Sequence, residues 1–241
     1  MSLKFKTLTP VVAIQRLSDN DPTLTSCNLG KNAVMQMRGS ELCPQIGAAL
    51  AHNTHCQELI LSDCNLSDQM VSEIASALVT NKVLLHLDLQ ENKIKDEGAT
   101  ALAKAIAQNQ VLMHLNLLNQ KGSRFGDATL HAFDDMFATN VTLLKIVWRL
   151  ESRQSFRLTK MLTRNNDIDR RIKAARDYAD LLPEKAQPIP SDIIAWRADA
   201  ALSLSFGSSR VSQASRDLNE CHLTLQCINS HVARYALRTG W

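Results

Sequence analysis

A 28-residue repeat is the feature of this sequence that most restricts its fold. The segments 55–66 (HCQELILSDCNL) and 83–94 (VLLHLDLQENKI) align without gaps, and a third copy, VLMHLNLLNQKG, starts 28 residues later at Val111. A degenerate copy starts near Thr142, and a partial early copy, TLTSCNLGKN, starts at Thr23. Because this leucine pattern with a period of about 20–29 residues is typical of leucine-rich repeats, we expect a solenoid.

Each copy predicts a short strand followed by a turn. The alternating leucines of LxLxx(N/C)xL form the inward side of a strand, because successive side chains point to opposite faces. The Asn or Cys side chain then bonds the backbone of the turn. We expect one such turn residue in each repeat, namely Cys27, Cys64, Asn92 and Gln120.

A helix is predicted after each of three strands. Apolar residues recur at helical spacing over 68–79, 96–107 and 127–138, with Ser67 and Asp96 as the expected N-caps. Asparagines follow these helices, and we expect them to take the left-handed conformation that often ends a helix: Asn81, Asn109 and Asn140. Residues 28–43 add nine residues to the regular period, so a looped insertion is expected there.

The predicted fold class is α/β: a short leucine-rich-repeat solenoid with parallel strands on its concave face, helices on its convex face and an all-α C-terminal helical extension. We expect a leucine-rich-repeat domain over residues 1–165, with a capping helix that begins at Thr9–Pro10. A helical bundle is expected over 166–241, where apolar residues of 211–235 recur three and four residues apart. This seam packs within the chain in the favoured interpretation and mediates dimerisation in the alternative.

The last repeats also resemble a known family. Residues from about Leu84 to Arg171 contain two well-formed repeats, a repeat with a long insert whose helix opens at Gly126–Asp127, and a closing helix that ends MLTRNNDIDRR. The long period resembles the ribonuclease-inhibitor type of leucine-rich repeat, and the closing segment resembles the C-terminal domain of tropomodulins. The resemblance implies binding to actin or to an actin-like partner. Secreted effectors of intracellular bacteria, which bind host proteins, carry similar small arrays and are an alternative.

Polar side chains on the predicted concave face are the first candidate binding site. Residues that alternate with the buried leucines form columns across the strands, because neighbouring strands lie about 4.8 Å apart. One column contains Glu58, His86, His114 and Lys145, and the next contains Asp88 and Asn116. We interpret both columns as partner-binding, with the two histidines adjacent. Neighbouring histidines match metal-ligand chemistry, but a repeat places two equivalent residues side by side easily, so no metal site is predicted.

A basic stripe on the predicted closing helix is the second candidate binding site. Its members recur four, four, three and four residues apart, which places them on one helical face: Arg149, Arg153, Arg157, Lys160 and Arg164. Between residues 145 and 176 there are ten basic and three acidic residues. This excess favours an acidic protein surface as the partner, with RNA and anionic membrane as alternatives. Few aromatic residues accompany the stripe, which argues against stacking on single-stranded nucleic acid.

The sequence carries no motif of a known catalytic class. Phosphate loops, GxSxG, HExxH and Cys–His nucleophile arrangements are missing, so we expect neither an enzyme nor a bound cofactor. The net charge of +3 is mild, and no stretch approaches the roughly 20 apolar residues of a membrane helix. The six scattered cysteines indicate reduced thiols. We therefore expect a cytoplasmic, non-catalytic protein–protein interaction module, located in the host cytosol if it is a secreted effector.

Overall fold

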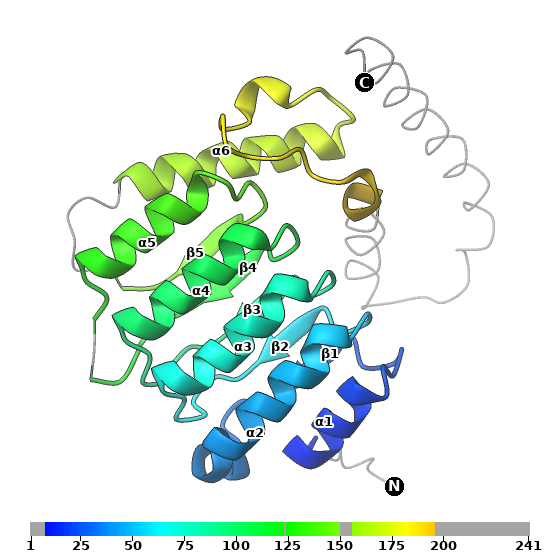
Figure 1. Cartoon of the computed structure of the whole chain (residues 1–241), viewed down its shortest axis with the longest axis vertical. Helices are drawn as coiled ribbons and strands as arrows, with labels where there is room; N and C mark the ends of the chain where they lie inside the picture. The colour runs from blue at the N-terminus through cyan, green and yellow to red at the C-terminus, as the bar shows by residue number, and fades with distance from the viewer. Residues whose placement is uncertain (1–7, 123, 150–155, 196–241) are drawn as a thin grey trace, which may run out of the picture.

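The computed structural model describes residues 8–122, 124–149 and 156–195 of the 241-residue chain. Within these residues, five short strands form one parallel sheet in sequence order (Figure 1). The strands are β1 (Ser26–Asn28), β2 (Glu58–Ile60), β3 (His86–Asp88), β4 (His114–Asn116) and β5 (Lys145–Val147). The predicted α/β class and the parallel leucine-rich-repeat solenoid are therefore confirmed.

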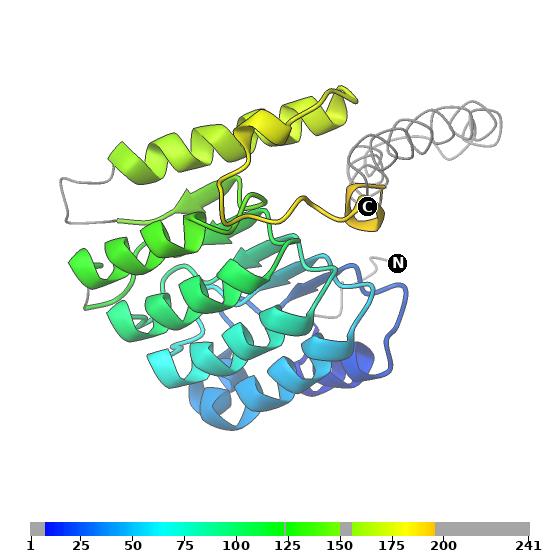
Figure 2. The ribbon, with the colours of Figure 1, turned by 45° about the horizontal axis from the view of Figure 1, so that its top comes forward.

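Helices form the second layer of the molecule. The array begins with α1 (Pro10–Ser18), and the strands are connected by α2 (Ala33–His52), α3 (Asp68–Thr80), α4 (Asp96–Gln108) and α5 (Asp127–Phe137). Helices α2–α5 lie side by side on one face of the sheet (Figures 1 and 2). After β5 come α6 (Phe156–Lys173) and the short 3₁₀ helix η1 (Ala179–Leu181). The central residue of each of the first four strands points into the core between the layers: Cys27, Leu59, Leu87 and Leu115.

The N-terminal end of the array is closed by α1, as predicted. The Thr9 hydroxyl accepts a hydrogen bond from a first-turn amide at 3.4 Å, and Pro10 begins the helix. The looped insertion predicted over residues 28–43 is wrong, because α2 already begins at Ala33. Asn32 caps this helix, and the buried Met35 starts an apolar face that continues through a kink at Arg38. The added residues therefore lengthen a helix.

The predicted turn residues connect neighbouring repeats. The Asn92 side chain accepts hydrogen bonds from the amides of Cys64 and Leu66 at 2.9 and 3.1 Å, and it donates to carbonyls of its own and the preceding repeat. Gln120 makes equivalent bonds one repeat later, with Oε1 accepting from the Ile94 amide at 3.0 Å. The turn-residue prediction is confirmed for these two positions and for Cys64, whose thiol donates to the Leu29 carbonyl at 3.1 Å.

The asparagines that follow the helices form a ladder of side-chain hydrogen bonds that runs from one repeat to the next. The left-handed conformation predicted for these asparagines is wrong. Asn81 and Asn109 are extended, with φ of −66° and −89°, and Asn140 has no positive φ either. Asn109 Nδ2 donates to carbonyls of Leu78 and Asn81 at 2.7 and 3.1 Å, and its Oδ1 accepts from two amides that follow it, at 2.8 and 2.7 Å. Each buried amide thereby satisfies four backbone groups that would otherwise be desolvated without partners.

The N-termini of α4 and α5 are capped across repeats, and the caps predicted for α3 and α4 are wrong. Ser67 makes no side-chain cap bond to α3, and Asp96 is the first residue of α4 and not its cap. Instead, Asp68 Oδ1 accepts from the Gly98 amide at 2.9 Å, and Asp96 Oδ1 accepts from the Gly126 amide at 3.0 Å. The carboxylate of one helix thus caps the next helix, which couples adjacent repeats.

The closing segment packs on the array in place of a further repeat. Helix α6 runs through the domain boundary predicted between residues 165 and 166. The chain after it returns along the array, where Ile189 and Ile193 join a second apolar cluster with Val111 and Val141. Residues 211–235 lie outside the described part of the chain, so the helical bundle and its dimerisation remain predictions.

Candidate functional site

The sheet register brings the predicted concave columns together. Six polar residues of β2–β5 pair across neighbouring strands, with Glu58, His86, His114 and Lys145 in one column and Asp88 and Asn116 in the next. The predicted adjacency of the two histidines is confirmed. Together the two columns line a hollow of about 200 Å³ on the concave face.

His86 and His114 form an edge-to-face pair at the centre of this face. Their ring centroids are 4.4 Å apart, and the ring planes meet at 80°. Burial lowers the pKa of His114 to about 4, with further lowering by His86 and Lys145 and an opposing effect of Asp169. Burial also lowers the pKa of His86, which Glu58 opposes. Both imidazoles are therefore neutral near pH 7, so the pair offers hydrogen-bonding nitrogens and not positive charge.

Other side chains of the two columns are held by hydrogen bonds. Glu58 accepts from the Ser26 hydroxyl at 2.6 Å. Asp88 and Asn116 each accept from the backbone amide two residues further on, at 2.9 and 3.1 Å. The Asn116 amide also donates to Gln90 Oε1 at 3.2 Å. These bonds restrict the side chains before any partner binds, which reduces the entropy lost on binding.

The predicted basic stripe is not one helical face. Helix α6 begins at Phe156, whereas Arg149 is the second residue after β5 and lies outside the helix. The helical spacing that includes Arg149 is therefore wrong, because the chain there has only just left the sheet. Arg153 lies outside the described residues.

The stripe residues on α6 have different environments. Arg157 is exposed, and its guanidinium lies 2.9 Å from Asp134 Oδ2 of α5, while Lys160 is exposed. Arg164 is half-buried and donates to two carbonyl oxygens at the C-terminal end of α5, at 3.0 and 2.9 Å. Arg164 therefore fixes α6 on the array. A continuous basic helical face was the reason to consider RNA or a membrane as the partner. The described residues do not form that face, so this support is lost.

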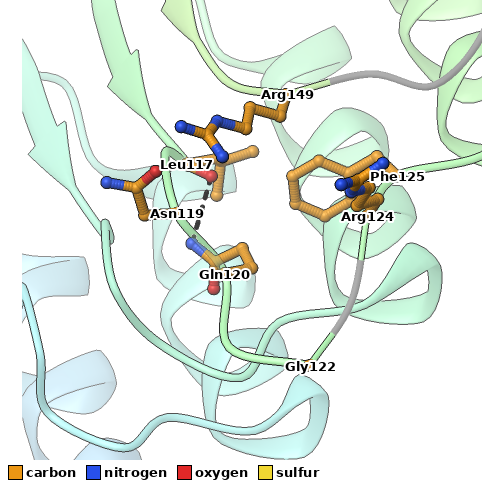
Figure 3. Close-up of a pocket in the computed structure, with 7 residues that line it drawn as sticks. All are labelled: Leu117, Asn119, Gln120, Gly122, Arg124, Phe125 and Arg149. Atoms are coloured by element: carbon orange, nitrogen blue, oxygen red, sulfur yellow. Dashed lines mark hydrogen bonds between the residues drawn. The ribbon is translucent and has the colours of Figure 1, made fainter.

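A pocket that the repeat pattern did not predict lies beside Arg149. It has a volume of about 400 Å³, and Figure 3 shows the residues that line it: Leu117, Asn119, Gln120, Gly122, Arg124, Phe125 and Arg149. All but Arg149 belong to the connection between β4 and α5. The long insert before Gly126–Asp127 was the sequence signal for this feature, but its length alone does not predict a pocket.

The buried thiols are not candidate nucleophiles. Burial raises the pKa of Cys27 and Cys43 to about 12 and the pKa of Cys56 and Cys64 to about 11. Such thiols are protonated at neutral pH, and only the thiolate is a strong nucleophile. Among the described residues, no group of three or more His, Cys, Asp or Glu residues could hold a metal ion, and no helix has the length and apolar character to span a bilayer.

A family model and solved structures match the repeat array. The model described as the TMOD/LMOD leucine-rich domain matches residues 9–168. The structure titled "Leiomodin-1 Actin-Binding Site 2 (ABS2)" is 27% identical, with a TM-score of 0.62, and the match covers 68% of this chain and 92% of that chain. The tropomodulin C-terminal domain of Caenorhabditis elegans is 20% identical, with a TM-score of 0.63 and coverage of 69% and 99%, and it shows the shared fold alone. No curated protein matches the sequence.

Proposed function

The chain belongs to the TMOD/LMOD leucine-rich domain family, and on this basis we propose that it is a non-catalytic protein that binds actin. The family match over residues 9–168 is the observation that carries the proposal. It is supported by the relative whose title names an actin-binding site, because that match includes 92% of the relative's chain. A cytoplasmic location, where actin filaments assemble, is part of the same proposal.

We assign the contact to the two concave columns and to the exposed cations of β5 and α6. The columns are rigidly held by the sheet and by their own hydrogen bonds, which suits them to recognise polar groups of a protein surface. Lys145 is exposed at one end of its column, and Arg157 and Lys160 are exposed on α6. These cations favour an acidic patch on the partner, because complementary charge speeds association and improves specificity.

The non-catalytic role is supported by the chemistry of the same surface. The central imidazoles are flanked by Glu58, Asp88 and Lys145. The Ser26 hydroxyl, which continues the same column on β1, donates to Glu58 and is separated from His86 by β2. The four described cysteines are buried in the core. The proposal therefore assigns every residue of this face to partner contact.

Actin binding by the full chain tests the proposal. We expect the protein to sediment with actin filaments or to change elongation of pyrene-labelled actin from pointed ends. Lys145→Glu should weaken this effect by about tenfold or more, because it reverses a charge at a predicted contact. His86→Ala should weaken it as well, by removing a neutral imidazole at the centre of the face.

Lys104→Glu is the matched control, since Lys104 is an exposed lysine of α4 on the opposite, helical face. Its actin binding should equal that of the unmodified chain. If the unmodified protein neither sediments with actin nor alters elongation at saturating concentration, the proposed function is wrong. If Lys145→Glu and Lys104→Glu behave alike, actin binds elsewhere on the molecule.

A further inference from the structure

The outward-facing residues of the sheet change their charge along the array. They are the first and third residues of each strand, on either side of the residue that packs in the core. The charged ones are acidic on β2 and β3, where Glu58 and Asp88 lie, and basic on β5, where Lys145 lies. Of the other two described strands, β1 and β4 carry no charge at these positions, because His114 is neutral near pH 7. The concave face is therefore negative over β2 and β3 and positive over β5.

Charged residues that surround this face carry both signs and do not create its polarity. Asp169 and Lys173 of α6 both act on His114, and they form an ion pair with each other at 2.8 Å. The loop residues with positive φ that follow β1, β2 and β3 are also of both signs: Lys31, Asp63 and Glu91. Lys121 forms an ion pair with one of them, Asp63. The charged residues that line the concave hollow are Glu58, Asp88 and Lys145, so the polarity comes from the strands themselves.

The charged groups of the hollow have bonding capacity left for a partner. The Glu58 carboxylate accepts from the Ser26 hydroxyl at 2.6 Å, and the Asp88 carboxylate accepts from the Gln90 amide at 2.9 Å. An ionised carboxylate has about four acceptor sites, so most of them stay open. Within the part of the chain that the structure describes, no ion pair involves either carboxylate or the exposed Lys145 ammonium. Both ends of the face therefore carry charge that a partner can neutralise.

We propose that the concave face binds an extended segment of a protein partner that crosses the strands, with a basic side chain over Glu58 and Asp88 and an acidic side chain over Lys145. Glu58 and Lys145 are three strand spacings apart, or about 14 Å, because neighbouring strands lie about 4.8 Å apart. An extended segment rises about 3.3 Å per residue, so its two charged side chains lie about four residues apart and on the same side. This inference deepens the proposed function and takes from it only that the partner is a protein.

Three pentapeptides that differ only in their end charges test this polarity on the ¹⁵N-labelled full chain. They are blocked at both ends and have the sequences RTVTE, RTVTR and ETVTE. Binding is followed through the backbone amide resonances of β3 and β4. We expect the mixed-charge peptide to bind about tenfold more tightly than either like-charge peptide, because each of those places equal charges together at one end of the face.

Lys145→Glu reverses the charge at one end of the face and should reverse the preference. This variant should bind RTVTR about tenfold more tightly than RTVTE, a change of specificity that a merely structural effect would not produce. Glu58→Gln keeps an acceptor for the Ser26 hydroxyl but removes the charge, so it should weaken RTVTE binding and reduce the preference over ETVTE. Lys104→Glu, on the helical face, is the matched control and should leave all three affinities unchanged.

Three results would overturn the inference: no binding of RTVTE, equal or tighter binding of a like-charge peptide by the unmodified chain, or an unchanged preference in Lys145→Glu. Thermal unfolding of Lys145→Glu should match that of the unmodified chain, because the side chain is exposed. If that variant unfolds early, Lys145→Gln is the second test and should lose the preference for RTVTE over RTVTR. Binding of RTVTE without actin binding would overturn the proposed function alone, whereas actin binding without a preference among the peptides would overturn only this inference.

Discussion

The central repeats and the closing segment satisfy the same backbone groups with different side chains. In the central repeats, buried asparagines one period apart, Asn81 and Asn109, bond the preceding repeat in the same way. At the closing segment, within the residues that the structure describes, no further repeat follows, and two residues of α6 complete the ladder. Arg164 donates to the Asn140 carbonyl at 2.9 Å, and Asn165 donates to the Leu143 carbonyl at 2.9 Å.

This difference separates the region that provides stability from the region that varies. A regular repeat must keep its side chains, because each one satisfies groups in two neighbouring repeats. The closing segment is freed from the period and contains the exposed cations of α6 and the returning chain. Stability should therefore be most sensitive to mutation in the central ladder, and binding should be most sensitive at the concave face.

Asn109→Ala should have the largest effect on stability. It leaves two amides and two carbonyls without their partners in the interior, and we expect a loss of about 3–5 kcal/mol in the free energy of unfolding. Urea unfolding followed by circular dichroism measures this loss. Gln108→Ala, at the exposed neighbouring position, is the control and should stay within about 0.5 kcal/mol. If both variants lose a similar amount of unfolding free energy, the asparagine ladder contributes no more to stability than the exposed surface does.

Arg164→Ala should have a smaller effect, about 1–3 kcal/mol, because it removes two charge-assisted hydrogen bonds to carbonyls at a half-buried site. Arg157→Ala is the matched control on the same helix. Its side chain is 70% exposed, so loss of the ion pair with Asp134 should cost less than about 0.5 kcal/mol. The same urea assay compares the two. Equal losses would show that α6 is not fixed to the array through Arg164.

His114→Gln should have the smallest effect, and it should depend on pH. The pKa of His114 is about 4 in the folded state against 6.5 ordinarily, so the unfolded state takes up the proton first as pH falls. The stability contributed by the neutral imidazole is complete above about pH 6.5 and is lost as pH falls towards about 4. The urea midpoint of the variant should therefore change less between about pH 7 and about pH 5. His86, Lys145, Asp169 and Lys173 also act on this group. An identical pH dependence in both proteins would contradict this account.

Much of the array could be predicted because its information is local and periodic. The alternation of leucines determines which strand residues point inward, and the constant period places equivalent residues side by side, as the His86–His114 pair shows. The turn residues Asn92 and Gln120 were predictable for the same reason. The helix over residues 33–43 was not, because a capping asparagine and a kink replaced the regular spacing.

By itself, the sequence determined the solenoid, its concave columns and the family resemblance in the closing repeats. Only the tertiary structure decided the roles of the polar side chains whose partners lie in another repeat. Asp96 caps the helix of the next repeat, and Arg164 bonds residues 24 and 27 positions earlier in the chain. The physical reason is that such bonds depend on distances between stacked repeats, which no spacing within one helix encodes. For the same reason, the spacing of the basic residues did not predict that Arg149 lines a pocket and lies outside α6.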